Sequence, residues 1–232
     1  RKSMATISVS DETMRPLKNL ASINQGLLFT ADNTLSTINS SNNVLCTAKI
    51  AETFPSEFGI YDLNNLLGTF SLFENPQIEI NDAEAYMTIR DGDNVSTTVK
   101  YRFAPKNLIK VPPKNHITLP SEDVSFTLDA ETLAKLQKAS SVMGLQHLFV
   151  NGSGGVITVE LGKPGDANSN RLRIVVGETS HEFSFIFLME NIKLLPDDYD
   201  VVISSQCISQ FTSSNSNRTY WISTETGSKF NS

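Results

Sequence analysis

The sequence predicts an α+β fold made of two similar domains. Its 232 residues are more than one small core needs and fit two domains of about 115 residues each. Each half combines segments whose apolar residues recur at helical spacing with short segments whose apolar residues alternate as in strands. Four prolines break up the segment between the halves. We therefore expect a first domain over residues 5–104, a connector over 105–121 and a second domain over 122–230.

The first half opens with a helix, expected from Ser10 to about Ile23, because Ser10 and Asp11 can cap it and its apolar residues fall on one side. A second helix is expected over 62–73, where leucines recur at helical spacing before Pro76. The remaining elements are antiparallel strands separated by polar turns, expected over 27–30, 35–38, 44–50, 58–61, 77–80, 85–90 and 96–103.

The second half repeats this order. A strand over 124–128 leads to a helix over 129–143, and a short helix over 189–195 ends at Pro196. The other strands are expected over 148–151, 156–161, 171–176, 182–187, 199–204, 209–212 and 219–223. Glu57-Phe58 and Glu182-Phe183 each begin a strand that leads into the second helix of its half. The shared order indicates an internal repeat.

Composition limits the function classes. The net charge of −6, from 25 acidic and 19 basic residues, argues against a nucleic-acid binder that relies on overall positive charge. No apolar run is long enough for a membrane helix, and residues 1–10 lack a secretory pattern, so we expect a soluble intracellular protein that does not engage membranes. Residues 1–3 precede Met4 and are expected to be foreign to the fold. Cys46 and Cys207 are expected to be buried thiols.

Patterns for catalysis or metal binding are missing from the sequence. The three histidines, His116, His147 and His181, have no metal-ligand spacing. The glycines of residues 152–155 lack the lysine and helix of a phosphate loop and predict a hairpin turn. The acids at 91–94 and at 197–200 are typical of turns. We therefore expect no enzyme activity, no cofactor and no metal.

Basic residues on helices remain as the candidate functional feature. Arg15 and Lys18 are three residues apart, as are Lys135 and Lys138, so each pair lies on one helical face within reach of adjacent phosphates. Lys193 adds one base on the expected last helix. The alternative is that these are ordinary solvated faces of amphipathic helices.

Two stretches of the first half carry a family resemblance. Leu-Lys-Asn-Leu-Ala-Ser-Ile-Asn-Gln-Gly at 17–26 and Ile-Tyr-Asp-Leu-Asn-Asn-Leu-Leu-Gly at 60–68 resemble the corresponding stretches of the DNA polymerase sliding clamp, or processivity factor, of T-even-type tailed bacteriophages. In the second half, Val-Pro-Pro-Lys at 111–114 and the helix with Leu136, Ser140 and Gly144 also fit.

The resemblance implies a DNA-clamp fold and a homotrimeric ring, with two helices per domain lining a central hole. Such a ring encircles double-stranded DNA without sequence specificity, is opened by a clamp-loader ATPase and tethers the replicative DNA polymerase through its C-terminal peptide. Late-transcription factors are further implied partners, and the implied location is the cytoplasm of the infected bacterial host. The residues implied to face DNA are Arg15, Lys18, Lys135, Lys138 and Lys193.

Two further sites follow from the same resemblance. The subunit interface would pair the strand before the connector with a second-domain strand of the next subunit, through Val99, Tyr101, Phe103, Leu172, Ile174 and Val176. The pocket for partner peptides would be lined by Ile38, Val44, Leu108, Ile109 and Val111. The competing hypothesis is a phage structural or protein–protein scaffold protein built from the same duplicated unit.

Overall fold

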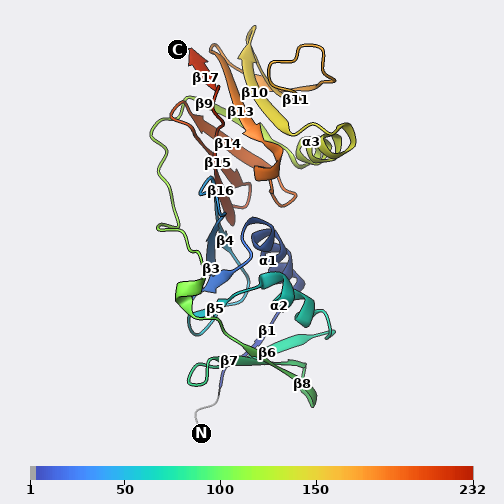
Figure 1. Ribbon diagram of the computed structural model, residues 1–232, viewed down its shortest axis with the longest axis vertical. Coiled ribbons are helices and arrows are strands. Elements are labelled where there is room, and N and C mark those ends of the chain that lie inside the picture. Colours follow the sequence, from blue (N-terminus) through green and yellow to red (C-terminus); the bar gives the residue numbers. More distant parts are fainter. Residues whose placement is uncertain (1–3, 232) are drawn as a thin grey trace. The chain divides into compact units, whose positions relative to one another are not determined.

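The computed structural model describes residues 4–231, so the expectation for residues 1–3 lies outside the described residues. The chain divides into two compact units, the first ending at Asn115 and the second beginning at His116 (Figure 1). This division lies within the segment expected to be the connector.

The first unit contains two helices and three groups of antiparallel strands. Four strands form one sheet in the order β1 (Thr6–Ser8), β6 (Pro76–Asn81), β7 (Tyr86–Asp91) and β8 (Asn94–Arg102). β3 (Thr34–Ile38) pairs with β4 (Val44–Lys49), and β2 (Leu27–Phe29) pairs with β5 (Phe58–Ile60). The helices are α1 (Asp11–Ile23) and α2 (Leu63–Phe70). The predicted helices and strands of this half are confirmed, whereas β1 was not predicted.

One apolar core joins the two helices to the sheet of this unit. Leu17 of α1 and Phe70 of α2 meet Ile78 of β6 and Met87 of β7 around one small apolar space. The start of α1 is held by Glu52, whose carboxylate accepts hydrogen bonds from the Ser10 amide at 3.0 Å and from the Thr13 hydroxyl. The side-chain cap expected from Ser10 is not formed; Glu52 instead fixes the Ser10 backbone and the Thr13 side chain at the start of the helix.

The first part of the connector belongs to the first unit. The Ala104 amide donates to the Gly59 carbonyl at 2.8 Å, and a 3₁₀ turn, η1 (Lys106–Leu108), follows. A Cβ added to Gly59 would lie 2.8 Å from the Ala104 carbonyl oxygen, so this close approach of two backbone segments requires glycine. The Asn115 carbonyl accepts from Thr47 Oγ1 at 2.5 Å. The polypeptide is thus tied to the first unit as far as residue 115.

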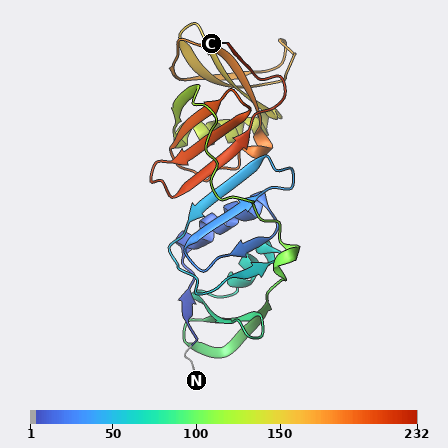
Figure 2. The ribbon, with the colours of Figure 1, turned by 90° about the vertical axis from the view of Figure 1, so that its left-hand side faces the viewer.

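The second unit contains two antiparallel sheets and one α-helix. Five strands pair in the order β12 (Leu172–Glu178), β11 (Val156–Gly162), β10 (His147–Ser153), β13 (Glu182–Leu188) and β17 (Lys229–Asn231). The second sheet pairs β16 (Arg218–Ser223), β15 (Ile208–Ser213), β14 (Tyr199–Ser204) and β9 (Val124–Leu128), whose strands run side by side in Figure 2. Phe187 and Phe211, 6.1 Å apart between ring centroids, join the two sheets. The predicted strands are confirmed, whereas β17 was not predicted.

The helix of this unit, α3 (Ala130–Met143), has defined caps at both ends. The Asp129 carboxylate accepts from the Thr132 amide at 2.7 Å, and Gly144 ends the helix with a φ of 64° in the left-handed region. Two glycines with positive φ, Gly154 and Gly155, form the tight turn between β10 and β11, which confirms the predicted hairpin.

Two predictions for the second half are wrong. The helix expected over 189–195 is a single 3₁₀ turn, η2 (Met189–Asn191). After it, Ile192 and Leu194 are buried while Lys193 is exposed, an alternation typical of extended backbone, and Pro196 disfavours helix at the residue before it. The thiol of Cys207 is exposed, because Cys207 lies in the turn between β14 and β15 with a φ of 70°.

Candidate nucleic-acid interface

Helix α1 presents two basic side chains to solvent. Arg15 and Lys18 are exposed, whereas Leu17 and Leu20 are about 1% exposed and face the core. Asp11 and Glu12 in the first turn are also exposed, where carboxylates favour the helix N-terminus. The solvent face of α1 therefore runs from an acidic first turn to a basic centre.

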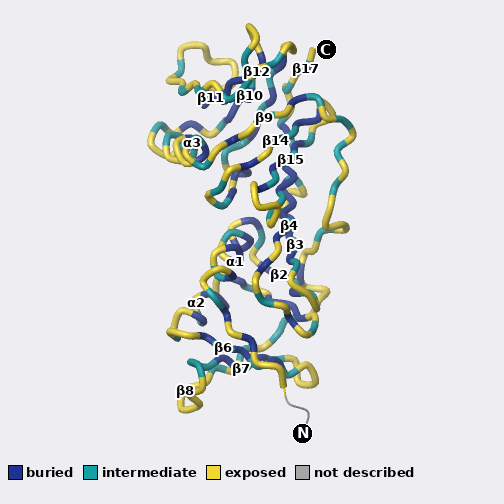
Figure 3. The backbone as a smooth tube through the Cα atoms, turned by 180° about the vertical axis from the view of Figure 1, so that it is seen from behind, coloured by how far each residue is buried: buried dark blue, intermediate teal, exposed yellow. Residues whose placement is uncertain are grey.

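Helix α3 repeats this arrangement in the second unit. Lys135 and Lys138 are exposed, and Leu133 and Leu136 are 1% exposed on the opposite side, an alternation visible in Figure 3. The hydrogen bonds with Thr132 hold the pKa of the Asp129 carboxyl below its ordinary value, and the positive charge of Lys135 acts in the same direction. The two basic residues on each of α1 and α3 are thus positioned by the start and the apolar face of their helix. Contacts of their own charges do not set their position.

The remaining helical surface is neutral. The exposed residues of α2 are Asn64, Asn65 and Gly68, with no charged side chain. Lys193 is exposed but follows η2 on extended backbone, so its expected place on a helix is wrong.

The residues expected at a subunit interface lie on two edge strands. β8 ends the sheet of the first unit and β12 ends the five-stranded sheet of the second, so each has one unpaired side within the described chain. On β8, Val99 and Tyr101 are half-buried; the Tyr101 hydroxyl donates to Asn65 Oδ1 at 2.8 Å, and burial raises its pKa, with the Asp62 charge adding to the effect. Phe103, just beyond β8, stacks on Phe58 at 4.6 Å.

The expected interface residues of the other edge, Leu172, Ile174 and Val176, are also half-buried. Ile174 is paired with Val159 of β11, whereas Val176 is the extra residue of a β-bulge. The structure therefore places three apolar residues along each free edge, which leaves both edges suited to pairing with a further strand.

The residues expected to line a peptide pocket divide into buried and exposed groups. Ile38, Val44 and Ile109 are at most 8% exposed, and Ile109 packs within 3.3 Å of the Cβ positions that Gly26 and Gly59 would have. Leu108 and Val111 are 58% and 39% exposed. Lys110 between them donates from Nζ to the Ser40 carbonyl at 2.8 Å, which holds this connector segment against the β3–β4 turn.

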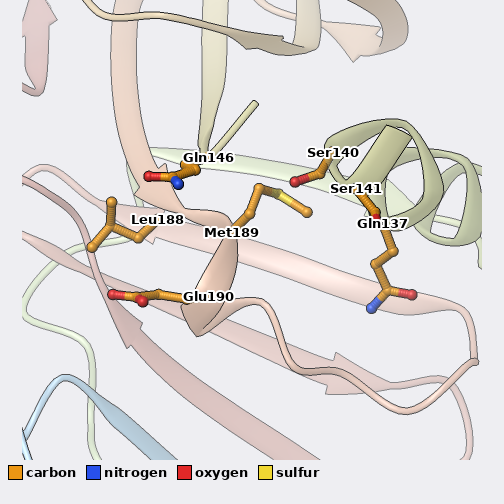
Figure 4. Close-up of a pocket in the computed structure, with 7 residues that line it drawn as sticks. All are labelled: Gln137, Ser140, Ser141, Gln146, Leu188, Met189 and Glu190. Carbon is orange, nitrogen blue, oxygen red and sulfur yellow. The ribbon is translucent and has the colours of Figure 1, made fainter. Parts of the chain in front are cut away.

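Sequence reasoning missed two hollows in the second unit. One, of about 430 Å³, separates α3 from η2 and is lined by Gln137, Ser140, Ser141, Gln146, Leu188, Met189 and Glu190 (Figure 4). In the first unit, by contrast, α1 packs directly on α2. The segment expected to form a second helix is here the 3₁₀ turn η2, and Pro196 is the sequence signal against helix at the end of that segment.

The other hollow, of about 570 Å³, lies on the solvent side of the five-stranded sheet. Its charged lining residues are Glu160, Glu182, Arg173 and Lys229. Glu160 is 8% exposed, and its carboxylate accepts hydrogen bonds from Asn151 Nδ2 and from Thr158 Oγ1. The alternation of arginine with apolar residues over 171–174 was the signal for a charged face on β12.

Residues 4–231 contain no group of three or more histidine, cysteine, aspartate or glutamate residues placed to hold a metal ion. None of their helices is long and apolar enough to span a membrane.

Comparison with known proteins places both units in one family. Residues 10–104 match the model for "DNA polymerase processivity factor", and residues 125–226 match the model for "gp45 sliding clamp, C terminal". The chain belongs to the phage sliding-clamp family. The sliding clamp of Vibrio phage KVP40 is 28% identical over 212 residues, which are 88% of this chain and 94% of that protein. The sliding clamp of Enterobacteria phage T4 is 26% identical over 202 residues, 85% of this chain and 87% of that protein.

Solved structures confirm that the fold is that of DNA clamps. Proliferating cellular nuclear antigen (PCNA) from Entamoeba histolytica has a TM-score of 0.69 with 13% identity and covers 96% of this chain and 100% of its own. The PCNA of A. fulgidus, solved with the C-terminal region of FEN-1 bound, has a TM-score of 0.69 with 12% identity over 97% of this chain and 100% of its own.

Proposed function

We propose that this chain is a sliding clamp that encircles duplex DNA as a homotrimeric ring and tethers the replicative polymerase in the infected bacterium. The observation that carries the proposal is that both α1 and α3 expose a pair of bases in a chain whose net charge is −6. An acidic outer surface repels DNA while a basic lining tolerates it, and a closed ring then retains DNA without tight binding.

The DNA contacts of such a ring go to phosphates. Arg15, Lys18, Lys135 and Lys138 are exposed and three residues apart within each pair, which suits neighbouring phosphates rather than base edges. Lys193 adds one charge from extended backbone. Contacts of this kind carry no sequence information and permit sliding, as a processivity factor requires.

Ring closure uses the two free edges. β8 of one copy pairs with β12 of the next, and the apolar residues Val99, Tyr101, Leu172 and Ile174 then share one face. Both edges would otherwise expose unpaired backbone groups, a state that folded proteins avoid. A clamp-loader ATPase opens this contact to admit DNA.

Partner peptides dock at the exposed part of the connector. Leu108 and Val111 are the accessible apolar residues there, whereas Ile109, Ile38 and Val44 support the site from below. Lys106, Lys110 and Lys114 are interspersed with them along the chain, and Lys106 is paired with Glu57 at 3.0 Å. A polymerase C-terminal peptide that carries acids beside its apolar anchors is attracted by these lysines. The A. fulgidus PCNA binds the C-terminal region of FEN-1, which supports this mode of partner binding. Late-transcription factors are further candidate clients.

Mass and DNA topology test the proposal together. Sedimentation at micromolar protein should give three copies of the 25.5 kDa chain, about 76 kDa. Once loaded, the ring should stay on closed circular DNA and be lost when that DNA is linearised. A monomer with no preference for circular DNA would instead favour the scaffold hypothesis.

A further inference from the structure

The free edge of β8 carries cations on the side opposite its apolar residues. Lys100 and Arg102 are exposed and alternate with the half-buried Val99 and Tyr101. Lys100 lies over the Tyr86 ring of β7, with its Nζ 4.1 Å from the ring centroid. Because side chains alternate along a strand, both cations stand on the solvent side of this sheet.

The free edge of β12 carries cations in the same way. Arg173 is exposed between the half-buried Leu172 and Ile174, and Arg171 stands directly before the strand. Within the sheet, Arg173 is opposite Glu160, and Arg171 Nη1 is 3.8 Å from Glu160 Oε1. One buried carboxylate therefore serves two arginines, which leaves this edge with excess positive charge.

The two edges meet in the ring on which this inference rests. If the strands pair antiparallel, as every described strand pair within each unit does, Val99 opposite Ile174 places Lys100 opposite Arg173 and Arg102 opposite Arg171. A shift by two residues in either direction, which keeps the apolar faces together, still leaves one pair of cations directly opposite each other. We propose that the boundary between neighbouring copies gathers these cations on its solvent side and binds a multivalent oxyanion there.

Nearby acids neutralise this boundary only in part, because Glu160 is shared by Arg171 and Arg173 and neither strand carries an acid close to Lys100 or Arg173. The acids next to or on the two strands, Asp93 and Glu178, lie at the opposite end of the paired region, beyond reach of Lys100 and Arg173. Like charges directly opposite on neighbouring strands destabilise their pairing. An anion between them offsets this repulsion, so anion binding and ring closure strengthen each other.

The surface beside β12 has room for such a ligand. The hollow of about 570 Å³ begins beside Arg173 and reaches Lys229, and its charged lining also includes the carboxylates of Glu160 and Glu182. An anion is therefore expected at the Arg173 end, toward the free edge of β12, rather than over the two carboxylates. Sulfate or pyrophosphate can bridge guanidinium and ammonium groups through several charge-assisted hydrogen bonds, which chloride cannot do. The ligand class is therefore a multivalent oxyanion, such as a phosphate group.

The inference predicts that removing a positive charge strengthens assembly. Lys100→Glu turns a repulsive pair into an attractive one, which raises the association constant of each subunit contact about fivefold. Three contacts per ring then raise the trimerisation constant about 100-fold, and the protein concentration at half-assembly falls about tenfold, since trimerisation depends on the square of monomer concentration. Lys49→Glu, the same charge change on an exposed residue of β4, should leave that concentration unchanged.

The test is sedimentation equilibrium of the full chain in sodium chloride and in sodium sulfate or pyrophosphate at equal ionic strength. The oxyanions should favour the wild-type trimer more than chloride does, and Lys100→Glu should abolish the difference. The double variant Lys100→Glu, Arg173→Glu places two acids opposite each other and should lose the gain in assembly.

The outcomes separate this inference from the proposed function. A wild-type trimer that Lys100→Glu weakens would mean that Lys100 faces no cation across the boundary, and it overturns the anion site while leaving the ring intact. A trimer with equal stability in sulfate and chloride overturns it as well. A wild-type monomer under every condition contradicts the ring itself.

Discussion

Replacing Lys135 and Lys138 by glutamine tests the assignment of α3 to the DNA-facing surface. Both lysines are exposed, and the apolar side of the helix, with Leu133 and Leu136 1% exposed, is untouched by the change. Glutamine is a good helix former, so we expect the melting temperature to move by less than about 2 °C. Any loss of DNA binding then reports on charge rather than on folding.

The magnitude follows from counterion release. Each phosphate contact contributes about −0.9 to the slope of log affinity against log salt concentration. A ring of three copies loses six lysine charges, so the slope should become less negative by about 2 if one copy contacts DNA at a time and by about 5 if all six lysines do. Between 50 and 200 mM salt, a slope change of 2 alters the fall in affinity roughly tenfold.

The assay is equilibrium binding to a fluorescent linear duplex, whose open ends let a ring thread without a loader. Lys49→Gln with Lys163→Gln is the matched control, since both lysines are exposed and lie outside the helices. An unchanged slope for the α3 variant, or an equal change for the control, would refute the DNA-facing assignment.

Three other predictions concern the connector, the start of α3 and a tight contact in the second unit. Ile109→Ser should lower the free energy of unfolding by about 2–4 kcal/mol in urea titration, because the buried Ile109 side chain packs on Gly26 and Gly59. Leu108→Ser with Val111→Ser should change the free energy of unfolding by less than about 0.5 kcal/mol, because both side chains are partly exposed. The same double variant should weaken polymerase-peptide binding in calorimetry. Asp129→Asn keeps a capping side chain but removes its titration. Because the folded-state pKa of Asp129 is lowered, the contribution of its carboxylate to stability is present above the ordinary pKa of 3.8 and is lost as pH falls below it. The melting temperature of the wild type should therefore fall more steeply than that of the variant between pH 4 and about pH 2.5. Gly152→Ala places a Cβ 2.3 Å from the Phe183 ring and should cost about 1–3 kcal/mol, which Phe183→Leu should partly restore; equal stability of both single variants and the double variant would contradict this contact.

Most of the fold could be predicted because local signals agreed with tertiary packing. The helix of residues 130–143 has an aspartate cap, an apolar face and a glycine end, and strands such as β6 and β13 alternate buried and less buried residues. The segment over 189–195 failed because Ile192 and Leu194 satisfy both a short helix and an extended strand-like segment. Both side chains are buried in the extended form, at 3% and 4% exposed, and the sequence does not show this burial.

The candidate site was predictable only in part for a related reason. Exposed bases on helices follow from periodicity, so Arg15, Lys18, Lys135 and Lys138 lie as expected on solvent faces. Whether an apolar connector residue is exposed depends on long-range packing. Ile109 is buried and Leu108 is exposed, although they are neighbours in the sequence. The sequence does not show that the charges of β12 lie on an edge strand, because this follows from the order of strands in the sheet.

The 3₁₀ turn in place of a second helix changes the symmetry that a duplex would experience. Two equivalent domains in each of three copies would give a lining with six nearly identical sectors. With α1 and α2 in one unit, and α3 beside a hollow in the other, alternate sectors of such a ring would differ in surface shape. The surface around the DNA axis would then repeat three times per turn rather than six. A rotating duplex would meet three shallow energy minima per turn, so the angular position of DNA in the ring would be weakly biased toward particular subunits.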